Sequence, residues 1–301
     1  MTDTATERPQ PTFGGMLRAE WLRLRKRPMT LVLLAVFLAL LAIQLLVQFV
    51  FVQLTGQQNG GAGLGMQTAA WQRRLIFPGV FGTVFNHTNG LGGILAIILA
   101  AGSMGGEYSW GTMRAQLARE PDRLRYLLAK IAALLLALLA SMGCALALGT
   151  LLALALGALT GAFGSVQPRD ILLLPAAMLQ ALYVLLPYVL LTIAFTILGR
   201  SQLAGVVGGL LYLVFEGGVG GFALFGLLGG VFLTLYNLLP GQNINVLVMA
   251  NAQLFGLEPE MVGALRTMTF PPYSQAIAVV AVYCAMFLAI AAARFGKTDI
   301  Q

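Results

Sequence analysis

Residues 30–52 read TLVLLAVFLALLAIQLLVQFVFV, an apolar run without a charged residue. A helix needs about 20 such residues to cross the hydrocarbon core of a bilayer, so this run is long enough to span it. Five further apolar runs follow along the chain, at residues 80–105, 126–159, 171–198, 202–224 and 274–293. The sequence therefore predicts an all-α, polytopic membrane protein with six transmembrane helices, built as a single transmembrane domain over residues 1–301.

The composition supports the same class. Of the 301 residues, 58% are hydrophobic and 10% are charged, whereas about 25% are charged in an ordinary soluble domain. Cys144 and Cys284 each lie inside an apolar run, which predicts buried free thiols rather than a disulfide. The first apolar run is too long for the core of a cleavable signal peptide, so we expect none.

The basic residues predict the orientation in the membrane, because short cytoplasmic loops carry an excess of Lys and Arg. With the N-terminus inside, 14 of the 18 Lys and Arg residues fall on the cytoplasmic side, and the others are Arg73, Arg74, Arg169 and Arg266. We therefore expect a multi-pass protein of the plasma (inner) membrane with both termini in the cytoplasm. The same distribution accounts for the net charge of +7 without a nucleic-acid partner.

Residues 13–27 predict a short amphipathic helix ahead of the first span. Its apolar side chains share one face, and they are Phe13, Met16, Leu17, Trp21 and Leu24. Basic residues fill most of the other faces, a pattern typical of helices that lie in the membrane interface, and Pro28 ends the helix. Two interpretations stay open: a topological anchor, or an anchor that also docks a partner protein.

Residues 202–238 are too long for one crossing. As a helix, these 37 residues would rise about 55 Å, nearly twice the thickness of the hydrocarbon core. Glycines interrupt the stretch between residues 217 and 230. We interpret it as a fifth span followed by a re-entrant or surface-lying piece, which begins an extracytoplasmic segment over residues 225–272.

Residues 106–131, between the second and third spans, read GEYSWGTMRAQLAREPDRLRYLLAKI. This stretch resembles the permeases of the type 2 ABC exporter class, which carry a pattern close to E-x-x-x-G-T-hydrophobic-R, then P-x-x-R, then a Lys that enters the third span. The matching positions are Glu107, Gly111, Thr112, Met113, Arg114, Pro121, Arg123 and Lys130. One position departs from the pattern, because Arg123 follows Pro121 by two residues rather than three.

Two further stretches are similar to the same family. Leu239-Pro240-Gly241 resembles an extracytoplasmic Leu-Pro element that follows the family's fifth span. Residues 294–300, RFGKTDI, resemble a frequent R-F-x-R-R-D-I ending, with Lys297 and Thr298 in place of two arginines. With these, the resemblance extends over essentially the whole chain.

The resemblance implies a transport permease that is not itself an enzyme. The chain would form the substrate pathway as a dimer, either a homodimer or a heterodimer with a related chain. A separate ABC nucleotide-binding subunit would hold ATP and Mg and hydrolyse the ATP, so we expect no cofactor in this chain. The cytoplasmic coupling segment would cover residues 106–124, with a helix capped by Thr112. Its coupling residues would be Glu107, Gly111, Thr112, Arg114, Arg119, Pro121 and Arg123.

The residues themselves argue against catalysis. Gly296-Lys297-Thr298 resembles the end of a phosphate-binding loop, but Ala291 stands where the first glycine belongs. With His87 as the single histidine, the chain has no H-E-x-x-H zinc motif. We therefore predict no catalytic, cofactor-binding or metal site.

Glu216 lies well inside the fifth predicted span, about 21 Å from Gln202 at 1.5 Å per residue. An ionisable residue at that depth is costly and marks a functional site. Asn89 lies at a similar depth in the second span, with Asn86 and His87 nearby. The sequence allows one polar cluster of these four residues, which would either contact substrate or hold the outer gate shut.

The runner-up interpretation is a self-contained secondary transporter or channel, in which Glu216 would be a proton or ion site. We find no inverted repeat of the kind common in secondary carriers, and we do find a charged cytoplasmic segment. A third class, a membrane sensor or an assembly factor, is disfavoured because no soluble domain is visible in the sequence.

Overall fold

The structure is a computed structural model, which describes residues 12–56, 62–109, 111, 122–224, 235–258 and 270–296. These residues form helices and connecting turns, and the described part of the chain contains no strand beyond one isolated bridge between Phe77 and Gly164. The helices are α1 (Phe13–Lys26), α2 (Pro28–Gly56), α3 (Ala62–Leu75), α4 (Gly79–Asn89), α5 (Leu91–Ser109), α7 (Arg123–Thr160), α8 (Pro168–Gly199), α9 (Gln202–Leu224), α11 (Pro240–Gln253) and α12 (Tyr273–Gly296).

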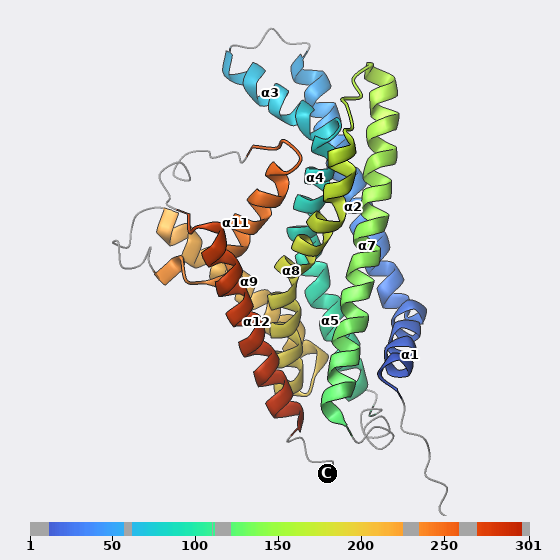
Figure 1. Cartoon of the computed structure of the whole chain (residues 1–301), viewed down its shortest axis with the longest axis vertical. Helices are drawn as coiled ribbons and strands as arrows, with labels where there is room; N and C mark the ends of the chain where they lie inside the picture. The colour runs from blue at the N-terminus through green and yellow to red at the C-terminus, as the bar shows by residue number, and fades with distance from the viewer. Residues whose placement is uncertain are drawn as a thin grey trace, which may run out of the picture.

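The long helices form an elongated bundle (Figure 1). By length and composition, five helices within the described ranges are able to cross a membrane: α2, α5, α7, α8 and α12. In α5 and α8 most residues of the apolar core are buried, whereas in α2, α7 and α12 only about a third or fewer are buried. The exposed residues are large and apolar, such as Leu151, Leu172 and Val282. Such a surface is typical of a protein in contact with lipid, and the chain is a multi-pass membrane protein in its architecture.

The second predicted span is two helices rather than one. Helix α4 ends at Asn89, and α5 begins at Leu91. Gly90 between them has φ −80° and ψ −92°, outside the helical region. The sequence Gly90-Leu91-Gly92-Gly93 is poor in helix-stabilising residues, so the chain bends here rather than continuing as one straight helix.

Helix α7 is longer than the span that its apolar run predicts. Its 38 residues rise about 57 Å, well beyond the thickness of a hydrocarbon core. The Asp122 side chain caps the first turn by accepting the Arg125 N–H. At the other end Gly161 takes a left-handed conformation (φ 72°), which favours glycine.

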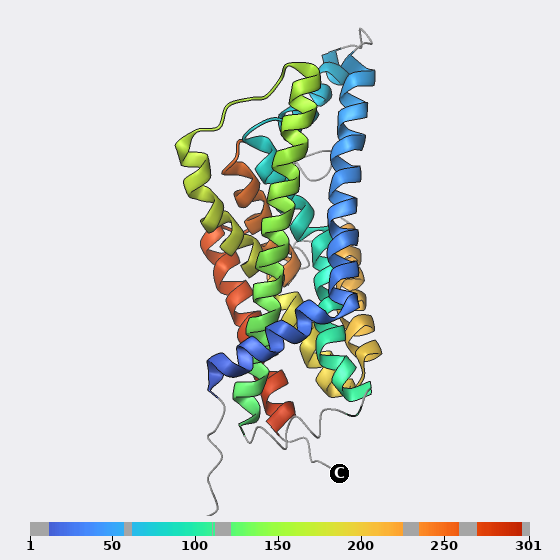
Figure 2. The same ribbon diagram turned by 90° about the vertical axis from the view of Figure 1, so that its right-hand side faces the viewer.

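A helix, α1, forms at the predicted amphipathic stretch and ends at Lys26, directly before the Arg27-Pro28 boundary with α2. It crosses the lower part of α7 at a steep angle (Figure 2). Met16, Glu20 and Leu24 are its buried residues, which places a carboxylate on the face that the sequence predicts to be apolar.

Two helices have no counterpart in the sequence prediction. Helix α3 packs against α2, where the Trp71 ring lies 4.8 Å from that of Phe51. Helix α11 starts at Pro240, a residue favoured in the first turn. It packs against α12, α4 and α8, so this part of the predicted extracytoplasmic segment is a helix seated on the bundle.

Basic residues that the sequence assigns to the cytoplasm gather at one end of the bundle. Arg27 donates to carbonyls near the end of α5, and Arg123 donates to the last carbonyl of α12. The start of α9 lies against Gly105 of α5. We call this the α1 end, and the opposite end, where α3 lies, the α3 end (Figure 1).

Candidate functional site

A cluster of buried charged side chains ties three helices together at the α1 end. Lys130 of α7 forms ion pairs with Glu107 of α5 and with Glu20 of α1, the latter at 3.3 Å. The Tyr126 hydroxyl donates to the second oxygen of Glu107 at 2.7 Å, and Lys130 also donates to that hydroxyl at 3.1 Å. We call Glu20, Glu107, Tyr126 and Lys130 the α1-end cluster.

The charges of the α1-end cluster are balanced once the adjacent Arg23 is included. Glu107 and Lys130 are each 2% exposed, and Glu20 is 4% exposed. Arg23 pairs with Glu20 one turn along α1, so two cations face two carboxylates. Removing ions from water costs several kcal/mol for each ion, and only close pairing with added hydrogen bonds offsets that cost. The cluster therefore fixes α1, α5 and α7 in one arrangement.

The predicted coupling segment begins and ends beside the α1-end cluster. Glu107 lies in the last turns of α5, and Gly111 follows with φ +65° in a turn closed on Tyr108. Gly111 thus lies in a turn, in a conformation that favours glycine. Thr112, Arg114, Arg119 and Pro121 lie outside the described residues. Arg123 begins α7 on the returning side.

Arg123 joins this segment to the end of the last helix. Its guanidinium donates to the Gly296 carbonyl at 2.9 Å. Beside it, the Phe295 ring stacks on Tyr126 with centroids 6.2 Å apart, and Phe295 is fully buried. The Phe-Gly pair near the C-terminus is therefore packed against the first turn of α7.

The structure defines the surroundings of Glu107, which the resemblance implies to be a coupling residue. In the structure its carboxylate is buried and already binds Lys130 and Tyr126. Glu107 therefore helps to position the segment that follows it.

A second buried carboxylate, Glu216 of α9, lies at the start of α11. One oxygen accepts the Gly241 N–H at 2.8 Å and the Tyr212 hydroxyl at 2.9 Å, and the other accepts the Tyr188 hydroxyl at 3.1 Å. The first N–H groups of a helix have no partner within the helix and favour an anion. Glu216 is 6% exposed, so it is shielded as the sequence predicts.

The predicted polar cluster between the second and fifth spans does not form. His87 faces α2, where its ring nitrogens contact Gln44 Oε1 at 2.6 Å and the Phe37 carbonyl at 3.3 Å. Glu216 instead binds groups of α8, α9 and α11. Asn89 is half-buried, and its side-chain atoms have no hydrogen-bond partner among the described residues. A similar predicted depth in the bilayer therefore does not place these residues in one site.

Asn86 lines a separate polar pocket of about 260 Å³ between α2, α4 and α11. The other polar groups around it come from α2 to α4 and from α11 and the residues after it: Gln44, Gln48, Arg74, Thr83, Asn245 and Glu258. Because Gln44 also contacts His87, two of the four predicted pathway residues adjoin this pocket.

Sequence reasoning missed several of the groups that make these sites. Glu20 was overlooked because it lies among basic residues in a helix that was assessed by its apolar side chains. Its spacing from Met16 and Leu24 nevertheless places it on the same face as they are. Tyr188 and Tyr212 carry no motif. Gln44 and Gln48 interrupt the first apolar run, and that interruption was an available signal.

Of the comparisons with known proteins, the one with family profiles found a match. Neither a search of curated proteins nor a search of solved structures returned a match. The profile of one family, described as "Protein of unknown function (DUF2705)", matches residues 73–301. That range includes α4 to α12, and with them Glu107, Lys130 and Glu216. The chain therefore belongs to the DUF2705 family.

Proposed function

We propose that this chain is the membrane-spanning permease subunit of an ATP-driven ABC exporter of the type 2 class. It forms the substrate pathway as a dimer and couples to a separate nucleotide-binding subunit. The observation that carries the proposal is the pairing of motif residues in space. Glu107 and Lys130, the first and last residues of the matching pattern, form a buried ion pair.

Other residues of the resemblance also meet. Arg123 of the pattern binds Gly296 of the similar C-terminal stretch. In each case residues far apart in sequence are in contact. This agreement supports a common architecture for the motif, because a chance match has no reason to pair its own members.

The arrangement suits the transmission of force. A permease driven by an ATPase needs a short element that projects toward the partner and is rigidly joined to the spans. Here residues 110–122 connect α5 to α7, and both helices are joined at that point by Lys130 and Glu107. A push on the segment is then transmitted to α1, α5 and α7 together.

The proposed topology has six spans. They are α2, α4 with α5, α7, α8, α9 and α12, with the α1 end in the cytoplasm. Helix α9 counts as the fifth because its apolar part, Gln202–Gly218, is continuous. We interpret α11 as a re-entrant helix that covers the outer part of the pathway.

Glu216 belongs to the gate in this proposal. Its carboxylate accepts hydrogen bonds from α8, α9 and α11, which leaves little capacity for a transported ion. The runner-up function, a secondary transporter with Glu216 as its ion site, is less well supported for that reason.

Co-purification tests the proposal. The full chain, tagged at its N-terminus, is co-expressed with the products of its neighbouring reading frames, among which the proposal expects a nucleotide-binding subunit, and is purified in mild detergent. We expect a stable complex that contains two permease chains for every two nucleotide-binding subunits. If the chain is recovered folded but alone, with or without ATP, the permease assignment is wrong.

A further inference from the structure

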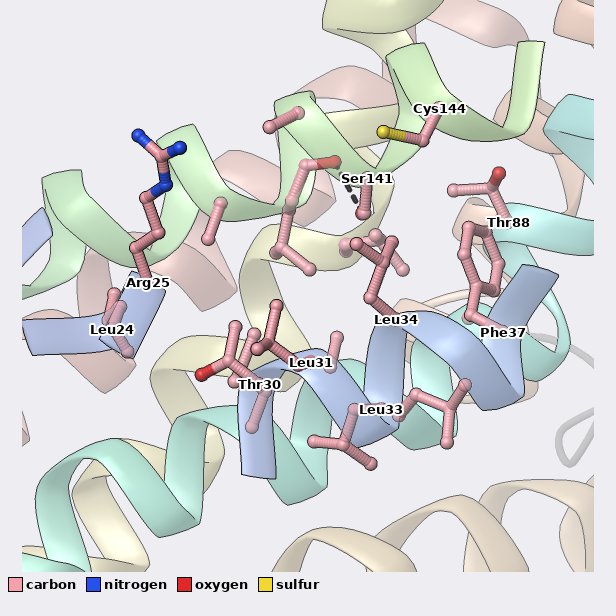
Figure 3. Close-up of a pocket in the computed structure, with 18 of the residues that line it drawn as sticks. Leu24, Arg25, Thr30, Leu31, Leu33, Leu34, Phe37, Thr88, Ser141 and Cys144 are labelled. Atoms are coloured by element: carbon pink, nitrogen blue, oxygen red, sulfur yellow. Dashed lines mark hydrogen bonds between the residues drawn. The ribbon is translucent and has the colours of Figure 1, made fainter. Parts of the chain in front are cut away.

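An apolar pocket of about 250 Å³ lies between α2 and α7, next to α1. Figure 3 shows Leu31 and Leu34 of α2 on one side and Ser141 and Cys144 of α7 on the other. Phe37 and Thr88 lie at one end of the pocket, and Arg25 lies at the other.

The pocket follows from a stripe of small residues on α7. Ala137, Ala140, Ser141 and Cys144 recur at three- and four-residue spacing and all line the pocket. Small side chains often allow two helices to pack closely. Here the facing side chains of α2 leave the space unfilled, and the lining that remains is almost wholly apolar.

Arg25 distinguishes this pocket from an ordinary packing defect. It is exposed and lines the pocket together with Trp21 of the same helix. Two nearby arginines are engaged within the protein, since Arg23 of α1 pairs with Glu20, and Arg27, directly after α1, binds the carbonyls of Gly102 and Ser103. Arg25 has no hydrogen bond or ion pair with any described residue.

We propose that this pocket binds one acyl chain of an anionic glycerophospholipid, with the lipid phosphate on Arg25. The site goes beyond the proposed transport function and does not depend on it. A basic residue and a tryptophan on an amphipathic helix are the groups that meet lipid headgroups. The pocket places an apolar space, large enough for part of an acyl chain, directly beside them.

The surroundings favour lipid over a second protein chain. Leu31 and Val32 at the start of α2 are each more than half exposed, as the lipid-facing surface of a span would be. If a second protein chain covered the pocket instead, the Arg25 guanidinium would be buried with no acidic partner among the described residues. Burying an unpaired charge is costly. The cation therefore points to an anionic ligand that keeps its headgroup in the interface.

Photo-crosslinking tests the proposal on the full chain in lipid nanodiscs. Phosphatidylglycerol and phosphatidylcholine, each with a diazirine in one acyl chain, are compared at equal amounts, and the labelled peptides are mapped by mass spectrometry. We expect phosphatidylglycerol to label residues 31–37 and 137–144 about fivefold more than phosphatidylcholine. That factor corresponds to roughly 1 kcal/mol for one basic residue at an anionic surface.

Two variants separate the site from general charge. Arg25→Gln is expected to abolish the preference for phosphatidylglycerol. Arg18→Gln removes another exposed cation of α1 that does not line the pocket, and it is expected to keep the preference. Thermal unfolding of both variants confirms that they are folded.

Three outcomes would overturn the proposal. The first is equal labelling of these peptides by the two lipids in the wild-type chain. The second is competition by free glycerol phosphate alone, which would indicate an anion site without an acyl chain. The third is efficient crosslinking of Cys144 between two chains under oxidation, because the exposed Cys144 lines the pocket and the stripe would then be an interface between copies.

Discussion

Lys130 of α7 forms an ion pair with Glu107 of α5, and both residues are 2% exposed. The two residues lie 23 positions apart, at either end of the segment that connects the two helices. Glu20 of α1 shares the same ammonium group. Because a buried ion is tolerated only with its counterions, this pair fixes where the connecting segment begins and ends.

Replacement of Lys130 by Met is expected to destabilise the protein by about 3 to 5 kcal/mol, because it leaves the Glu107 carboxylate buried without its cation. Methionine keeps the length and the apolar part of the side chain. The measurement is thermal unfolding of the full chain in detergent, followed by helical circular dichroism.

The control is the double variant Lys130→Met/Glu107→Gln, which removes both charges of the pair. We expect it to be clearly more stable than Lys130→Met, because less uncompensated charge is buried. If the double variant loses at least the sum of the two single losses, the ion pair does not hold these helices together.

Glu216 is expected to hold α11 on the bundle. Glu216→Ala leaves the Gly241 N–H and the hydroxyls of Tyr188 and Tyr212 without their acceptor. Each unsatisfied buried group costs about 1 to 3 kcal/mol, so the loss should be large. Hydrogen exchange of the α11 backbone measures it, and faster exchange in α11 than in α7 is the expected result.

Gly241→Ala tests the same contact without a change of charge. An added Cβ would lie 2.6 Å from Glu216 Oε2, which is too close. Gly217→Ala serves as the control, since a Cβ there meets nothing within 4 Å. Unchanged α11 exchange in Gly241→Ala would show that Glu216 is not what seats this helix.

The contact of α5 with the start of α9 provides a further pair of variants. A Cβ on Gly105 would lie 2.6 Å from the backbone nitrogen of Gln202, so Gly105→Ala is expected to displace the first turn of α9. A Cβ on the adjacent Gly106 would have its nearest neighbour at 3.8 Å. Thermal unfolding should fall for Gly105→Ala alone, and equal stability of the two variants would contradict this packing.

The proposed orientation, with the α1 end in the cytoplasm, predicts which positions face the outside of the cell. In a background without Cys144 and Cys284, single cysteines at Gln58 and Glu258 should react with an impermeant thiol reagent added to intact cells. A cysteine at Arg200 should react only after the inner face is opened. The reverse pattern would place the α1 end outside.

The elements that sequence predicts well are those with a long uniform pattern. The apolar runs predict helices where the structure has α2, α7, α8 and α12. The amphipathic stretch and Pro28 predict the bounds of α1 to within one residue. The break at Gly90 directly follows the polar residues Asn86, His87 and Asn89, and it was missed because a reading of the apolar run does not report backbone conformation. Helix α3 was missed because its residues have no long apolar run.

The sites were predicted less well, because depth along a helix says nothing about rotation around it. Glu216 and Asn89 share a depth, yet Glu216 faces Tyr188 and α11. Glu107 was singled out, but its partners Glu20 and Lys130 come from helices whose packing sequence alone does not give. Contacts between residues far apart in sequence can be identified only when the packing of the helices is known.

ATP hydrolysis by the assembled complex tests the central claim most directly. The full chain and its nucleotide-binding subunit are reconstituted in lipid, and the hydrolysis rate is compared with that of the subunit alone. We expect the chain to alter the rate severalfold and Arg114→Ala, in the predicted coupling segment, to remove most of that effect. Arg266→Ala, on the predicted outer side, should behave as the wild type. A rate that is the same with and without the chain would contradict the account.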